Sequence, residues 1–278
     1  MFTRLLGAFL RAIIVTMVLV VPTLSFPEEA LGDEQLMSIV SLLFGVMVFF
    51  EYATKYPSFL EYCHAAPFNR LRASVLVVSM LAMVLVFSTL TVSSSAGTLV
   101  VWAGGAISSV VTVVVDPDTV FLWDFSHATS SAERAVAPVA VAAAWGVCAI
   151  GALLVMVYLS VIGWCAGNKR FDFYANLPMF TVSDDSLLPK MLRRSGYKCM
   201  LASLISPVLI PLTLYALYVQ FGFNAAHSIQ NMIWIGTVWA FVPMNFMLLA
   251  YSRFIVAAKM EIQLADLRDA RARDQQSL

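Results

Sequence analysis

Long apolar stretches separated by short polar segments make up almost the whole chain. A membrane-spanning helix needs about 20 mostly apolar residues, because the hydrocarbon core of a bilayer is about 30 Å thick. Seven stretches approach this length, at residues 5–26, 36–53, 73–92, 97–115, 136–165, 199–221 and 232–257. The pattern predicts an all-α, polytopic transmembrane helical bundle.

The composition agrees with this pattern. Hydrophobic residues make up 60% of the 278 residues and charged residues only 12%, whereas a soluble domain has about 25% charged residues. A water-soluble protein is therefore excluded. The formal net charge is zero, so no overall positive field attracts nucleic acid, and we expect no nucleic-acid partner.

The positions of lysine and arginine indicate how many stretches cross the membrane, because basic residues near span ends favour the cytoplasmic side. If all seven stretches cross and the N-terminus is inside, the basic loop at 166–198 lies outside. If all seven cross and the N-terminus is outside, 11 basic residues lie inside and 6 outside. If residues 97–115 do not cross, the six remaining crossings place 16 of the 17 basic residues inside and only Arg134 outside. We therefore predict about six spans, with seven as the alternative, and both termini on the cytoplasmic side of a bacterial-type inner membrane.

The segment at 97–115 differs from the other stretches. It is rich in valine, threonine and serine and contains the paired Gly104 and Gly105, residue types that weaken an isolated helix. Irregular backbone exposed to lipid leaves its polar groups unpaired. We therefore predict a re-entrant or interfacial element, shielded by the bundle or by a partner chain, with an ordinary seventh span as the alternative.

Together, the seven stretches predict one integral membrane domain, residues 1–257, which is followed by a charged cytoplasmic tail, residues 258–278. The first stretch lacks a small-residue cleavage site, so we expect it to remain as a helix. Residues 136–165 are rich in alanine and glycine, which allows close helix packing in lipid. Pro207 and Pro211 lie four residues apart in the stretch at 199–221 and predict a bend there.

No motif points to an enzyme. The chain lacks a nucleophile elbow, a Walker loop, a dinucleotide fingerprint and a zinc-protease motif. His127 and His227 fall in the two outer loops and are weak candidates for haem or metal ligands. None of the four cysteines forms a C-x-x-C pair. We expect a non-catalytic protein without a cofactor.

The two cytoplasmic loops carry the candidate binding residues. Aromatic rings settle at the headgroup level and also anchor protein interfaces. Ser186 opens a short candidate helix with one basic side, which suits an anionic leaflet. The residues predicted to bind a partner or the leaflet are Tyr56, Phe59, Tyr62, Phe171, Phe173, Tyr174, Lys190, Arg193 and Arg194.

Few charged residues fall within the spans, and they lie near the cytoplasmic ends. They are Arg11, Glu51 and Arg253. Ion-coupled carriers usually need a carboxylate or histidine nearer the membrane centre, which disfavours a pump. Asn245 is a candidate residue of a solute path, although an interhelical hydrogen bond is the favoured interpretation.

Three functions remain open from the sequence. The first is an accessory subunit or assembly factor of a larger membrane complex, with membrane lipids and other subunits as partners. The second is a transporter or channel for a small neutral solute. The third is a membrane oxidoreductase component in which His127 and His227 bind haem or a metal.

Overall fold

A computed structural model describes residues 2–27, 34–54, 61–62, 66–92, 94–114, 131–164, 176–177, 187–222 and 228–276. All regular structure in these ranges is α-helical, which confirms the all-α part of the predicted fold class. The helices are α1 (Phe2–Ser25), α2 (Glu34–Ala53), α3 (Phe68–Ser88), α4 (Ser95–Val114), α6 (Ser131–Val161), α8 (Leu188–Phe221) and α9 (Ile229–Gln276).

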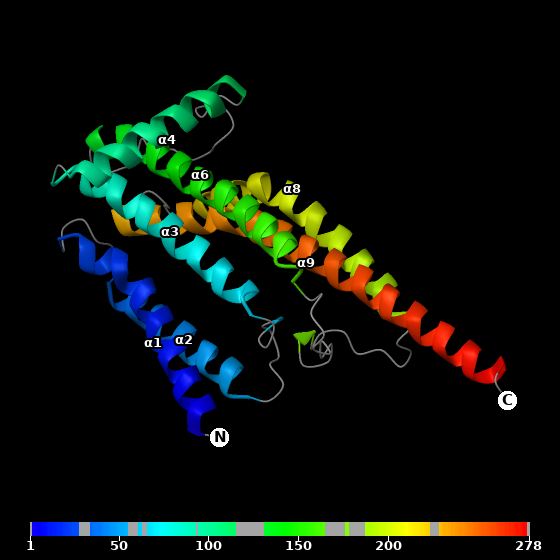
Figure 1. Cartoon of the computed structure of the whole chain (residues 1–278). Helices are drawn as coiled ribbons and strands as arrows, with labels where there is room; N and C mark the ends of the chain where they lie inside the picture. The colour runs from blue at the N-terminus through cyan, green and yellow to red at the C-terminus, as the bar shows by residue number, and fades with distance from the viewer. Residues whose placement is uncertain are drawn as a thin grey trace.

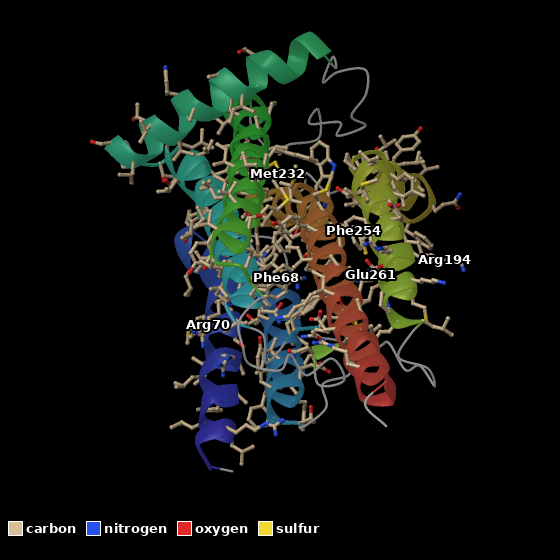
Figure 2. All side chains as sticks on the ribbon, turned by 45° about the vertical axis from the view of Figure 1, so that its right-hand side comes forward. Phe68, Arg70, Arg194, Met232, Phe254 and Glu261 are labelled. Atoms are coloured by element: carbon tan, nitrogen blue, oxygen red, sulfur yellow. The ribbon has the colours of Figure 1, made fainter. Side chains whose placement is uncertain are left out.

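Every helix except α4 runs up or down a common bundle (Figure 1). The start of α1 and the end of α9 lie at the same end of this bundle, called the terminal end below. Successive helices alternate in direction, so α3 and α8 also start at the terminal end. In contrast, α4 lies across the opposite end, steeply inclined to α3 and α6 (Figures 1 and 2).

The core lies where α3, α6 and α9 meet. The side chains of Ala140 and Ala144 are fully buried and allow α6 to approach its neighbours closely. Larger side chains from α3 and α9 fill the remaining space, among them Met83, Phe87 and Met232. The alanine-rich stretch is therefore the central packing helix, as its composition predicts.

The helices α8 and α9 form a long antiparallel pair that extends beyond α3 and α6 at the terminal end (Figure 1). The sequence predicts a separate short helix from Ser186 before the stretch at 199–221, but α8 is continuous from Leu188 to Phe221. Gly196 lies inside this helix, where a Cβ would come within 2.8 Å of the Phe254 ring, so α8 and α9 pack closely at this residue. The last helix also continues unbroken through the predicted tail to Gln276.

The helices α1 and α2 form a hairpin that packs mainly against itself. It touches the rest of the bundle at few positions, one of which is the 2.9 Å hydrogen bond from Gln230 Nε2 to Thr23 Oγ1. An apolar groove of about 520 Å³ follows one side of the hairpin. Its lining includes Phe9, Ile13, Met17, Leu42, Val46 and Phe49.

Five helical segments are long and apolar enough to cross a membrane: Arg4–Ser25, Phe68–Ser88, Ser131–Val161, Leu188–Phe221 and Ile229–Asp266. The apolar part of α2 is shorter, at Ser38–Ala53. Among the described residues, α4 is not one of the five. These helices support a multi-pass membrane protein.

Candidate functional site

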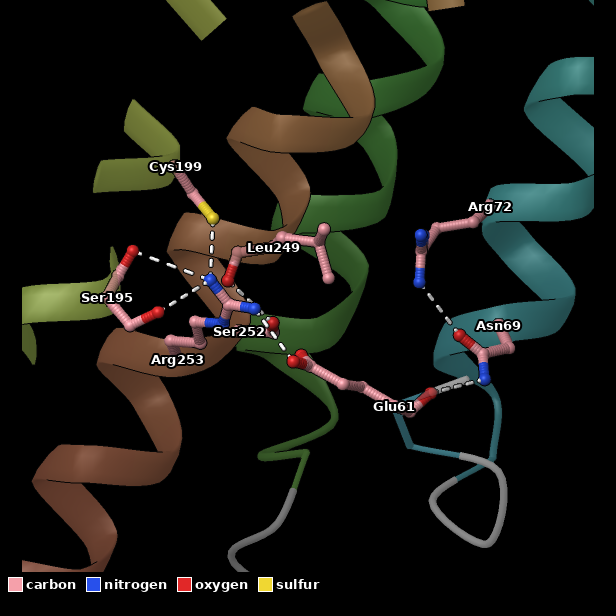
Figure 3. A network of polar contacts seen from close by, with 8 residues as sticks. All are labelled: Glu61, Asn69, Arg72, Ser195, Cys199, Leu249, Ser252 and Arg253. Carbon is pink, nitrogen blue, oxygen red and sulfur yellow. Dashed lines mark hydrogen bonds and ion pairs between the residues drawn. The ribbon is translucent and has the colours of Figure 1, made fainter. Parts of the chain in front are cut away.

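Arg253 of α9 is the centre of a buried polar cluster at the terminal end (Figure 3). Its Nη2 forms an ion pair with Glu61 Oε1 at 2.7 Å, and the two side chains are only 11% and 6% exposed. Its Nη1 donates to Ser195 Oγ at 2.9 Å and lies 2.6 Å from Cys199 Sγ, both on α8. One arginine thus joins α8, α9 and the segment before α3.

Arg72 of α3 holds the second half of the cluster. Its Nε donates to Asn245 Oδ1 of α9 at 2.8 Å, and its Nη1 donates to Asn69 Oδ1 at 3.0 Å. The Nδ2 of Asn69 then donates to the backbone oxygen of Glu61 at 2.7 Å, which links the two halves (Figure 3). Asn245 therefore makes the interhelical hydrogen bond that the sequence favours over a solute contact.

The position of Arg253 along α9 is compatible with its charge. At a rise of about 1.5 Å per residue, Arg253 lies about 36 Å along α9 from Ile229, beyond a hydrocarbon thickness of about 30 Å. Charged side chains cost least near the ends of spans. The described part of the cluster contains two arginines and one glutamate, and its hydrogen bonds offset part of the loss of hydration.

Three aromatic rings pack beside the cluster. The Tyr62 ring meets Phe68 at 5.1 Å and Trp164 at 5.4 Å between ring centroids, both edge-on. The backbone nitrogen of Tyr62 donates to the oxygen of Asn176 at 2.8 Å. Tyr62, predicted to bind a partner or the leaflet, is only 1% exposed, because its ring fills the core between α3 and the end of α6.

The prolines of α8 also create an interhelical contact. Pro211 has no N–H to donate, so the carbonyl of Pro207, four residues earlier, has no partner within the helix. The indole Nε1 of Trp239 on α9 donates to this carbonyl at 2.9 Å. The carbonyl that proline sets free is therefore used to bind the neighbouring helix.

The predicted basic residues of α8 separate into two groups. Arg193 forms a bidentate ion pair with Glu261 of α9, at 3.0 Å from Nε and 2.6 Å from Nη2. Arg194 and Lys190 are exposed. Figure 2 shows Glu261 between α8 and α9, and Arg194 on the side of α8 away from α9.

The other predicted site residues lie outside the described residues: Tyr56, Phe59, His127, Phe171, Phe173, Tyr174 and His227. Within the part of the chain that the structure describes, no group of three or more potential metal ligands occurs. Cys148 and Cys199 are buried and form no disulfide.

Comparison with known protein families, with characterised proteins and with solved structures finds no match to this chain.

Sequence reasoning missed Glu61 and Arg72 as members of a site. A sequence does not show which charges meet across the bundle, so neither residue stands out from the other charges near the span ends. One signal was present: Arg72 falls one turn inside the helix that begins at Phe68, where an arginine facing lipid would need a buried partner.

Proposed function

We propose that this chain is a non-catalytic integral membrane protein that acts as an accessory subunit or assembly factor of a larger membrane complex. The observation that carries the proposal is the position of α4. This apolar helix lies across the end of the bundle, where it packs on α6 and, to a lesser extent, on α3.

The packed side of α4 is formed by glycine. A Cβ on Gly104 would lie 2.6 Å from the backbone oxygen of Val139 and 3.1 Å from Ala143 Cβ, so the two helices approach through this residue. The opposite side is open: Leu99 is 66% exposed and Trp102 is 72% exposed. A Cβ on Gly105 would meet no described atom within 4 Å.

Such an open face suits a helix of another chain. Small residues allow close backbone approach in lipid, and an exposed tryptophan supplies contact area. From the sequence, residues 97–115 are expected to be shielded by the bundle or by a partner chain, and the open side of α4 favours the partner chain.

The polar cluster supports this function over transport. Asn245, the candidate residue of a solute path, is bonded to Arg72, and Arg253 bonds Glu61 and α8. In the described residues these groups hold helices together, which suits a fixed scaffold better than a path that must open and close.

The proposed topology has six crossings, with the terminal end and both termini in the cytoplasm of a bacterial-type inner membrane and α4 on the outer side. The basic residues carry this orientation, since those of α8 and α9 lie near the terminal end. In this arrangement α4 is an interfacial helix that meets its partner at the outer surface.

The test is purification of the full chain from native membranes in mild detergent, with every co-eluting chain identified and quantified. Gly105→Leu is the decisive variant, because a Cβ there meets no described atom within 4 Å, whereas the bulk of leucine would block a helix packed on that face. We expect stoichiometric companions with the natural chain and their loss with Gly105→Leu.

The matched control is Ala216→Leu, which adds similar bulk at an exposed position of α8. It should retain every companion. A solitary natural chain overturns the proposal, and companions that survive Gly105→Leu remove α4 as the contact.

A further inference from the structure

The exposed face of α8 changes from basic to apolar along its length. Lys190, Arg194 and Lys198 are all exposed and lie four residues apart, so they share one face of the helix. These three residues are called the basic stripe. Arg193 lies off this line and is paired with Glu261.

The same face continues directly into lipid-compatible side chains. Leu201, Ile205 and Val208 are 57%, 47% and 62% exposed, and Leu212 is 51% exposed. From residue 201 to the end of α8 at Phe221 the helix is about 30 Å long, equal to the hydrocarbon thickness of a bilayer. The membrane boundary therefore falls between Lys198 and Leu201.

The contacts of α8 on its inner side agree with this boundary. Ser195 and Cys199 meet Arg253 of the polar cluster, so the buried charges and the basic stripe lie at one level. Tyr197 is 59% exposed and contacts Phe254 at 5.1 Å between ring centroids. Tyrosine is typical of the headgroup layer, where one end of the ring is wet and the other apolar.

The charges of the stripe are unfavourable for the helix alone. Like charges four residues apart repel each other, and the first turn of α8 contains no acidic residue. No ion pair joins Lys190, Arg194 or Lys198 to a described residue, in contrast to Arg193. A layer of external anions at this level removes the repulsion.

From these observations we propose that the basic stripe binds the phosphate headgroups of anionic phospholipids in the leaflet at the terminal end, with acyl chains along Leu201, Ile205 and Val208. A lipid has a charged headgroup followed directly by apolar acyl chains, and the basic stripe is followed directly by an apolar face of matching length. A protein segment does not require this apolar face, so the arrangement favours a lipid. The inference is independent of the proposed function, which concerns α4 at the opposite end.

The experiment is native mass spectrometry of the purified full chain in neutral detergent. It is titrated with dioleoyl-phosphatidylglycerol or with dioleoyl-phosphatidylcholine, which has the same acyl chains. We expect tighter binding of phosphatidylglycerol, weakened when the salt concentration rises. In the variant Lys190→Gln/Arg194→Gln/Lys198→Gln its affinity should fall by about fivefold for each charge removed.

Arg193→Gln is the matched control, since it removes one arginine of the same helix that is already paired. It should bind phosphatidylglycerol as the natural chain does. The salt series uses only the natural chain, so the test holds even where the triple variant does not fold.

Equal affinity for the two lipids, or equal loss in Arg193→Gln and the triple variant, overturns the proposal. So does a triple variant that keeps its lipid binding but loses a co-purified protein, because the stripe is then a protein contact.

Discussion

Two adjacent glycines of α4 have very different surroundings, and this difference is testable. A Cβ on Gly104 overlaps the carbonyl oxygen of Val139 at 2.6 Å, whereas a Cβ on Gly105 meets no described atom within 4 Å. Alanine favours a helix over glycine by about 1 kcal/mol, but forced overlap in a packed site costs about 1–3 kcal/mol. We expect Gly105→Ala to raise the thermal unfolding midpoint in detergent slightly, and Gly104→Ala to lower it by several degrees. Equal shifts would contradict the α4–α6 contact.

The ion pair between Glu61 and Arg253 gives the second prediction at this scale. Glu61→Gln keeps the shape of the side chain but removes the charge that pairs with Arg253 Nη2. Removing one partner of a buried pair costs about 3 kcal/mol, so unfolding should begin at clearly lower denaturant concentration. The control is Arg193→Gln, whose exposed pair with Glu261 contributes at most about 1 kcal/mol. Similar losses in both variants would show that the cluster is not a special stabilising feature.

At the scale of elements, Pro211 and Trp239 are expected to act together. Trp239→Phe keeps an aromatic side chain but removes the donor to the Pro207 carbonyl, a loss of about 1–2 kcal/mol for a buried acceptor. Pro211→Ala restores a backbone N–H that binds the same carbonyl within α8. Trp239→Phe should therefore cost less in the Pro211→Ala background. A double-mutant cycle on unfolding free energy measures this coupling, and strictly additive costs would exclude it.

The helices themselves were largely predictable from the sequence, because a bilayer requires long apolar runs and these runs are visible residue by residue. The alanines of α6 likewise announced a central packing helix. Two element-level features were not predictable. The close packing of α8 at Gly196 involves the Phe254 ring, and the use of the Pro207 carbonyl depends on Trp239. Both depend on a partner from another helix, which local sequence does not specify.

The candidate site shows the same division. Exposed Lys190 and Arg194 were identified from helical spacing alone. Arg193 was predicted to bind a partner or the leaflet, but it pairs with Glu261, which lies 68 residues later in the chain. Glu61 and Arg72 were missed because their partners, Arg253 and Asn245, lie 192 and 173 residues away along the chain. Long-range pairing of polar groups is fixed by packing, not by periodicity.

At the scale of the whole molecule, the proposed topology places α4 and the end of α9 on opposite sides of the membrane. Trp102 of α4 is 72% exposed and Ile262 of α9 is 64% exposed. In a chain whose four cysteines are replaced by alanine, we introduce Trp102→Cys or Ile262→Cys and label intact cells with a membrane-impermeant maleimide. When the chain is produced in excess over its companions, Trp102→Cys should react directly, because the side of α4 that they cover is then open to the outer aqueous phase. Ile262→Cys should react only after the inner membrane is permeabilised.

Each alternative arrangement gives a different labelling pattern. If α4 crosses the membrane, Trp102→Cys lies within the hydrocarbon and stays unlabelled under both conditions, which rules out six crossings with an outer interfacial helix. If the orientation is inverted, Ile262→Cys reacts in intact cells and Trp102→Cys does not. The basic residues would then face the outer side, against the charge asymmetry on which the orientation rests. The pair of variants therefore tests the number of crossings and the orientation separately.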